Sequence, residues 1–107
     1  MTTTYDHADM KDRDKWIKST TMIDDVRQMT LSTRKTFSGK LTTTATVATL
    51  SGDWEVHKMY TDFHQVLESS DVRVTAKAMR EQHARHKAQI HEIEKLAINH
   101  YYPKKEA

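Results

Sequence analysis

The chain of 107 residues contains no cysteine, one proline and two glycines. Without cysteine, a disulfide framework and thiolate chemistry are both excluded. Two glycines are too few for a glycine-rich loop around a phosphate, and neither a dinucleotide fingerprint nor a nucleophile elbow occurs. These absences argue against an enzyme, and we expect a protein that works without a cofactor.

Long hydrophobic runs are missing as well. No apolar stretch approaches the roughly 20 residues of a membrane-spanning helix. The N-terminal sequence also lacks the basic-then-apolar pattern of a secretory signal. We therefore expect a soluble, cytoplasmic protein without membrane contact.

Hydrophobic residues make up 36% of the sequence and charged residues 30%. A short chain with so few hydrophobic residues has a thin core, which such proteins commonly complete in an oligomer. We expect one small domain over residues 1–107, with a flexible leader at 1–7 and a flexible tail at 103–107. We also expect a homo-oligomer, a dimer or larger.

The charged residues are unevenly distributed along the chain. Residues 31–50 hold three basic and no acidic residues, 51–70 hold one basic and four acidic, and 71–107 hold eight basic and five acidic. The net charges are therefore +3, −3 and +3, which predicts segments that complement one another or a second copy of the chain.

The apolar residues recur mostly at helical spacing and predict a mainly α fold. A first helix is expected from about residue 9 to 29, with Trp16, Ile23, Val26 and Met29 near one face. Two further helices, at about 53–69 and 74–102, are separated by a short connector and predict an antiparallel helical hairpin. An all-α bundle is the alternative.

The threonine-rich segment at about 33–50 is ambiguous. Threonine and glycine disfavour a helix, whereas Phe37, Leu41, Ala45 and Val47 share one parity, as they would on one side of a strand. With Ser38-Gly39 available as a turn, we expect a short β-hairpin.

The segment 74–102 also fits a heptad pattern, which is typical of a coiled coil. Its core positions predict a seam within the hairpin or between copies in an oligomer. The seam residues are Met79, His83, His86, Ile90, Ile93 and Ala97.

Histidine at core positions allows two further interpretations. His57 and His64 could approach His83 and His86 across the hairpin and bind Zn or a similar metal. However, neither Glu-x-x-His nor His-Glu-x-x-His occurs, so we expect no metal site. Alternatively, these imidazoles would charge on mild acidification and make an interface sensitive to pH.

Basic residues form two groups that could bind a partner or nucleic acid. They are Arg73, Lys77, Arg80, Lys87 and Lys95 on the outer face of the C-terminal helix, and Arg34, Lys35 and Lys40 in the threonine-rich segment. A solvated helix face is the alternative for the first group.

Together these features predict a small, non-enzymatic interaction protein of the regulator, adaptor or inhibitor type. It would present its helical hairpin to a protein partner whose identity the sequence does not reveal. The alternatives are a nucleic-acid or nucleotide-binding module that uses the basic stripe, and a histidine-rich, metal-binding helical protein.

Overall fold

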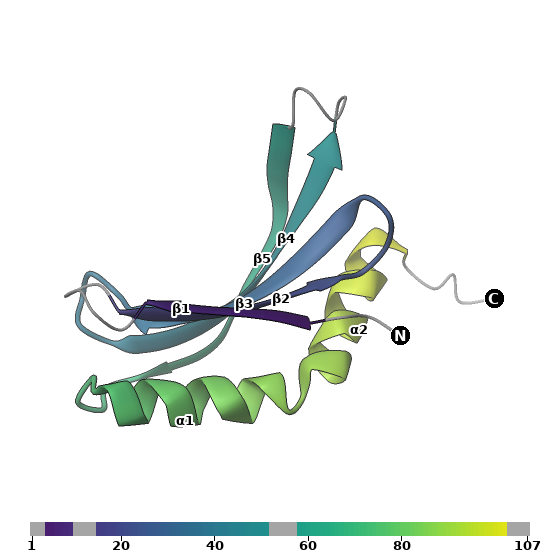
Figure 1. Ribbon diagram of the computed structural model, residues 1–107. Helices are drawn as coiled ribbons and strands as arrows, with labels where there is room; N and C mark the ends of the chain where they lie inside the picture. Colours follow the sequence, from purple (N-terminus) through teal and green to yellow (C-terminus); the bar gives the residue numbers. More distant parts are fainter. Residues whose placement is uncertain (1–3, 10–14, 52–57, 103–107) are drawn as a thin grey trace.

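The computed structural model describes residues 4–9, 15–51 and 58–102. They form an antiparallel sheet of five strands followed by two helices that pack on it, so the fold is α+β (Figure 1). The strands are β1 (Thr4–Asp9), β2 (Trp16–Met22), β3 (Arg27–Lys35), β4 (Leu41–Ser51) and β5 (Lys58–Ser70), and the helices are α1 (Ala76–Lys87) and α2 (Ile90–Tyr101).

The strands lie in the sheet in chain order, and each is antiparallel to the next. Both helices lie on one face of the sheet, α1 along one end and α2 along the other (Figure 1). The opposite face carries no helix in the described part of the chain. The prediction of a mainly α fold is therefore wrong, as is the alternative of an all-α bundle.

The helix expected over residues 9–29 is replaced by β2, a turn and the start of β3. The alternation of β2 is hard to detect because its fully buried positions are Ser19 and Thr21, which are polar. Strand β1 lies largely within the expected flexible leader, whereas residues 1–3 and 103–107 lie outside the described residues.

The helix expected over 53–69 is strand β5 in its described part. Register shifts occur where Thr43 and Thr44 pair with Glu68 and Val66, and where Val47 and Ala48 pair with Phe63 and Thr61. In each case β5 contains one additional residue, as in a β-bulge. Phe63 and Leu67, which pack against the core, are four residues apart, a spacing that fits one face of a strand as well as one face of a helix.

The hairpin expected near residues 33–50 is present but is longer than predicted. Strands β3 and β4 pair from Arg27↔Thr49 to Lys35↔Leu41, and Gly39 in the turn has a φ of 87°. Leu41 and Val47 are fully buried, as their parity predicts, whereas Phe37 is fully exposed. Phe37 lies in the turn, beyond the end of the strand, so the parity of the strand does not apply to it.

The helix expected over 74–102 is divided into two at Ala88-Gln89. The two helices follow one another at an angle across the sheet (Figure 1), so neither a helical hairpin nor a coiled coil forms. Neither helix is long and apolar enough to cross a bilayer, within the part of the chain that the structure describes.

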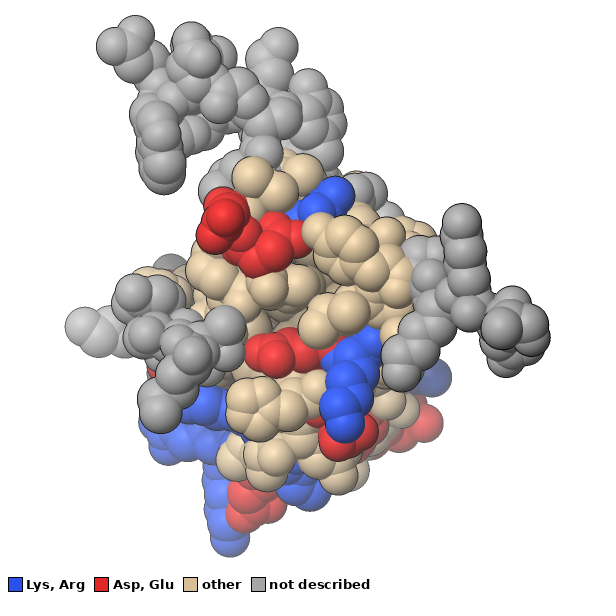
Figure 2. Space-filling model, turned by 90° about the vertical axis from the view of Figure 1, so that its right-hand side faces the viewer, with Lys and Arg blue, Asp and Glu red and all other residues tan. Residues whose placement is uncertain are grey.

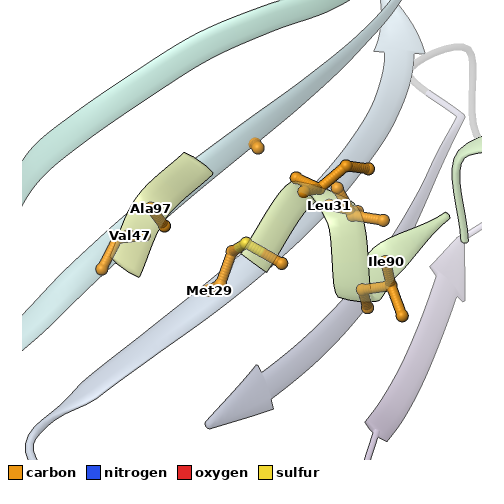
Figure 3. Packing of buried hydrophobic residues seen from close by; sticks show 7 residues of the cluster. Met29, Leu31, Val47, Ile90 and Ala97 are labelled. Carbon is orange, nitrogen blue, oxygen red and sulfur yellow. The ribbon is translucent and has the colours of Figure 1, made fainter. Parts of the chain in front are cut away.

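The hydrophobic core lies between α2 and the middle of the sheet (Figure 3). Side chains from β3 and β4 meet side chains from α2, and partly buried apolar residues surround them. The central cluster consists of Met29, Leu31, Ala45, Val47, Ile90, Ile93 and Ala97. Its helical members belong to the predicted seam, but they pack against the sheet.

Candidate functional site

A layer of polar side chains lies between α1 and the sheet. Each of the five strands contributes one residue, and α1 contributes two that connect them. The strand residues are Asp6, Ser19, Thr33, Thr43 and Ser70, and the helix residues are Gln82 and His83.

His83 is 4% exposed and connects β2 with β3 through its two ring nitrogens. Its Nε2 lies 2.8 Å from Ser19 Oγ, and its Nδ1 lies 2.8 Å from Thr33 Oγ1. Ser19 in turn donates to Asp6 Oδ1 at 2.6 Å. Both ring nitrogens of this buried histidine are therefore satisfied by the sheet.

Gln82 extends the same layer toward β4 and β5. Its Nε2 donates to the carbonyl of Leu41 at 3.2 Å and to Thr43 Oγ1 at 3.0 Å. Its Oε1 accepts from Ser70 Oγ at 3.1 Å. Since Thr33 Oγ1 and Thr43 Oγ1 are 2.8 Å apart, the hydrogen bonds form one continuous chain from Ser70 to Asp6.

The number of available protons determines which group donates in each hydrogen bond of this chain. Ser19 donates its one proton to Asp6, so His83 must donate Nε2–H to Ser19. A neutral ring then accepts at Nδ1 from Thr33, and Thr43 donates to Thr33. Desolvation by burial lowers the pKa of His83, more than the nearby Asp6 carboxylate raises it, which agrees with the neutral ring.

Ser19, His83 and Asp6 resemble a catalytic triad only in composition. In a triad, histidine accepts the proton of serine and is itself oriented by the carboxylate. Here the hydroxyl of Ser19 donates to Asp6 instead, and Ser19 is fully buried. The arrangement holds α1 on the sheet and does not activate the serine.

A cleft of about 220 Å³ borders this layer near Asp6, Arg80 and Lys87. Asp6 forms an ion pair with Lys87. The hydrogen bonds from Lys87 and Ser19 lower the pKa of the Asp6 carboxyl. The carboxylate therefore neutralises the nearest cation of the cleft.

The histidines considered as metal ligands do not come together. His64 lies on β5 beside Thr46, with Oγ1 to Nδ1 at 3.2 Å, on the face without helices. His83 and His86 lie on the other face, where His86 Nε2 is 2.9 Å from Glu68 Oε1. His57 lies outside the described residues, and among those described no group of three or more possible ligands could hold a metal.

The basic stripe of the C-terminal segment is largely paired with carboxylates. Lys77 lies 4.0 Å from Glu81, Lys95 lies 3.1 Å from Glu92, and Lys87 is bound to Asp6. At the level of α1, in the lower part of Figure 2, basic and acidic side chains are interspersed. Arg73 and Arg80 are the members of the stripe without an ion pair to a described residue.

The second basic group, in contrast, lies together. Arg34 and Lys35 end β3, and Lys40 follows the turn to β4. Lys40 lies 3.7 Å from Asp71, and both side chains are largely exposed. Arg34 and Lys35 make no ion pair with any residue in the described ranges.

Arg34 also lines a cleft of about 460 Å³ on the open face of the sheet, the face opposite the helices. Its lining consists of Lys18, Thr20, Gln28, Thr30, Ser32, Arg34, Thr44, Thr46, Ala48, Thr61 and His64. The described lining residues thus include two full cations, many hydroxyls and no carboxylate.

The register explains why these side chains share one face. Lys18 pairs with Ser32, and Thr20 pairs with Thr30, so they lie side by side on adjacent strands. Thr20 and Thr30 are 3.1 Å apart at their hydroxyls. At the end of the row, the ammonium of Lys18 lies 5.0 Å from the ring centroid of Trp16, a cation–π contact.

Sequence analysis identified Arg34 but missed Lys18 and the row of hydroxyls. The alternation of Thr30, Ser32 and Arg34 with buried residues was the available signal. It could be interpreted only once the segment was known to be a strand. Comparison with known proteins adds no relative, because the chain matches no family model, no curated protein and no solved structure.

Proposed function

We propose that this protein is a non-enzymatic binding module whose open sheet face binds single-stranded nucleic acid. The observation that carries the proposal is the cleft of about 460 Å³ lined by cations and hydroxyls without a described carboxylate. Nucleic-acid backbones offer one negative charge per nucleotide, and lysine, arginine and hydroxyl side chains are their usual contacts.

Charge balance favours this face over the helices. Lys18 and Arg34 make no ion pair within the described chain, whereas Lys77, Lys87 and Lys95 are already paired. A phosphate that binds Lys77, Lys87 or Lys95 must compete with their carboxylate partners, whereas Lys18 and Arg34 have no such competitor among the described residues. We therefore assign the binding to the sheet.

The shape of the site favours a single strand. Proteins that hold single strands without reading their sequence combine a basic groove with aromatic rings on which bases stack. The open face offers the groove, and Trp16 lies at its edge beside Lys18. The same proposal includes a cytoplasmic location, where such a ligand is available.

The expected protein partner and homo-oligomer stay predictions, but the surface for them has changed. The helical hairpin that was expected to bind the protein partner does not form. Five of the six predicted seam residues are buried within the molecule. An oligomer interface would therefore need other residues.

Fluorescence anisotropy with a labelled oligothymidine of about 15 nucleotides, and with an RNA of equal length, tests the proposal. Exchanging both Lys18 and Arg34 for Gln removes two phosphate contacts. We expect a loss of affinity of at least about tenfold at low salt. We also expect the slope of log K against log salt to become about 1.4 smaller, at about 0.7 per contact.

The double variant Lys77→Gln, Lys95→Gln is the matched control, since it removes the same charge from the helices. It should leave the affinity within about twofold. Equal losses in both double variants would contradict an assignment to the open face. Absence of binding by the unaltered protein at low salt would refute the proposed function itself.

A further inference from the structure

The turn between β3 and β4, residues 36–40, exposes a phenylalanine to solvent. Phe37 is fully exposed, although burial of such a ring is favourable. Its ring contacts no other aromatic ring or cation among the described residues. Its exposure is not compensated by contacts in the described part of the chain.

The turn is well ordered by its own hydrogen bonds. Thr36 N–H donates to the carbonyl of Lys40 at 2.8 Å, and Gly39 N–H donates to the carbonyl of Thr36 at 2.9 Å. The hydroxyl of Thr36 accepts from Lys40 N–H at 3.2 Å and lies 3.0 Å from Ser38 Oγ. Gly39 supplies the positive φ, 87°, that closes the turn. Phe37 is thus presented on a preformed support.

Cations surround this ring in the sequence and continue into the open-face cleft. Lys35 and Lys40 flank the turn, and Arg34 belongs to both the turn region and the cleft lining. Arg34 also pairs in register with Trp16 on β2. The exposed ring therefore lies three residues beyond Arg34, a cation of the cleft lining, whereas Lys40 on the other side of the turn is paired with Asp71.

We propose that Phe37 is a base-stacking residue that extends the nucleic-acid site beyond the edge of the sheet. The inference rests on the proposed function. Phosphates would lie along Lys18 and Arg34, and the base that leaves the end of the cleft would stack on Phe37 beside Lys35. Stacking on an aromatic ring is tolerant of sequence, so the site would bind all four bases.

Because the ring is exposed, Phe37→Ala should fold normally, and the effect on binding can be measured directly. We expect Phe37→Ala to weaken binding of the oligothymidine about tenfold, which is within the range for one stacked base. Binding of an abasic oligonucleotide with the same number of phosphates should stay within about twofold. Phe37→Tyr, which keeps the ring, should restore oligothymidine binding.

Val72→Ala is the matched control, since Val72 is 50% exposed and lies in the β5–α1 connection, at the same end of the sheet. It should leave both affinities unchanged. If Phe37→Ala binds oligothymidine as the unaltered protein does, the stacking role is refuted, while binding that still depends on Lys18 and Arg34 would uphold the proposed function. An equal loss for the abasic ligand would also refute stacking.

A second experiment tests binding to vesicles that contain phosphatidylserine, because an aromatic residue among lysines also suits an anionic bilayer. We expect no sedimentation with these vesicles. Vesicle binding that disappears in Phe37→Ala, together with absent oligonucleotide binding, would overturn the inference in favour of a membrane contact.

Discussion

The two helices cover the same face of the sheet by opposite means. Helix α2 places Ile90, Ile93 and Ala97 on apolar side chains of β3 and β4 (Figure 3). Helix α1 buries Met79 but meets the sheet mainly through the buried Gln82 and His83, whose partners are serine and threonine hydroxyls and a carbonyl. At its edges, His86 and Lys87 contact carboxylates of β5 and β1.

The apolar contacts of α2 are not directional, whereas the hydrogen bonds of α1 are. Burial of apolar area is favourable in nearly any orientation, so the contacts of α2 do not by themselves determine how the helix lies. Each hydrogen bond under α1 requires one donor and one acceptor at a fixed position, and the loss of one partner leaves a buried group unsatisfied. We infer that the α2 half provides most of the stability and the α1 half fixes the register between helix and sheet.

The largest effect is therefore expected in the α2 half. Leu31 is fully buried in the central cluster, and Leu31→Ala should lower the free energy of unfolding by about 2–5 kcal/mol. Urea denaturation followed by circular dichroism measures the change. Leu96→Ala, at a residue 46% exposed on α2, is the control and should stay within about 0.5 kcal/mol. Similar losses in the two variants would contradict the packing of α2 described above.

A smaller effect is expected in the α1 half. Gln82→Ala leaves the hydroxyls of Thr43 and Ser70 and the carbonyl of Leu41 without this partner. Buried groups left unsatisfied cost about 1–3 kcal/mol. Gln89→Ala changes an exposed glutamine without a capping bond and should be nearly neutral. If Gln82→Ala unfolds at the same urea concentration as the unaltered protein, the hydrogen bonds of Gln82 contribute nothing to stability.

The same contrast explains how far the sequence could predict the fold. The helical character of 76–101 and the Ser38-Gly39 hairpin were predictable, because apolar periodicity and turn residues are local signals. Strand β2 was not, since Ser19 is buried by a hydrogen bond to a histidine 64 residues away in the chain. Strand β5 was misinterpreted because Phe63 and Leu67, which pack against the core, are four residues apart, a spacing that a strand and a helix share.

The candidate site divides in the same way. Arg34, Lys35 and Lys40 lie close together in the sequence, so a local charge count found them. Lys18 joins Arg34 only through the pairing of β2 with β3, and the register of two strands is not contained in either segment alone. The role of His83 was sought in a seam between helices, whereas its partners are Ser19 and Thr33 in the sheet.

The smallest of these effects is expected from pH, through the same histidine. The pKa of His83 is lowered from its ordinary value of 6.5, chiefly by burial, while Asp6 opposes the shift and Lys87 and His86 add to it. As pH falls through 6.5, the unfolded chain binds a proton before the folded one does, so the free energy of unfolding decreases. A second proton on the ring would also make Nδ1 a donor, so the Thr33 hydroxyl could no longer donate to it and its proton would need another acceptor.

The contribution of His83 should therefore be complete above pH 6.5 and decline below it, down to the folded pKa. The pKa of Asp6 is also lowered, so the stability that Asp6 contributes is lost only below the ordinary aspartate pKa of 3.8. Urea midpoints from pH 7.5 to 5.0 measure the His83 window. His83→Gln should reduce the slope there, whereas His91→Gln, at a side chain 80% exposed, should keep it. If the urea midpoint of His83→Gln depends on pH as that of the unaltered protein does, protonation of His83 does not cause the loss of stability in acid. The polar layer under α1 would then orient the helix without making its stability depend on pH.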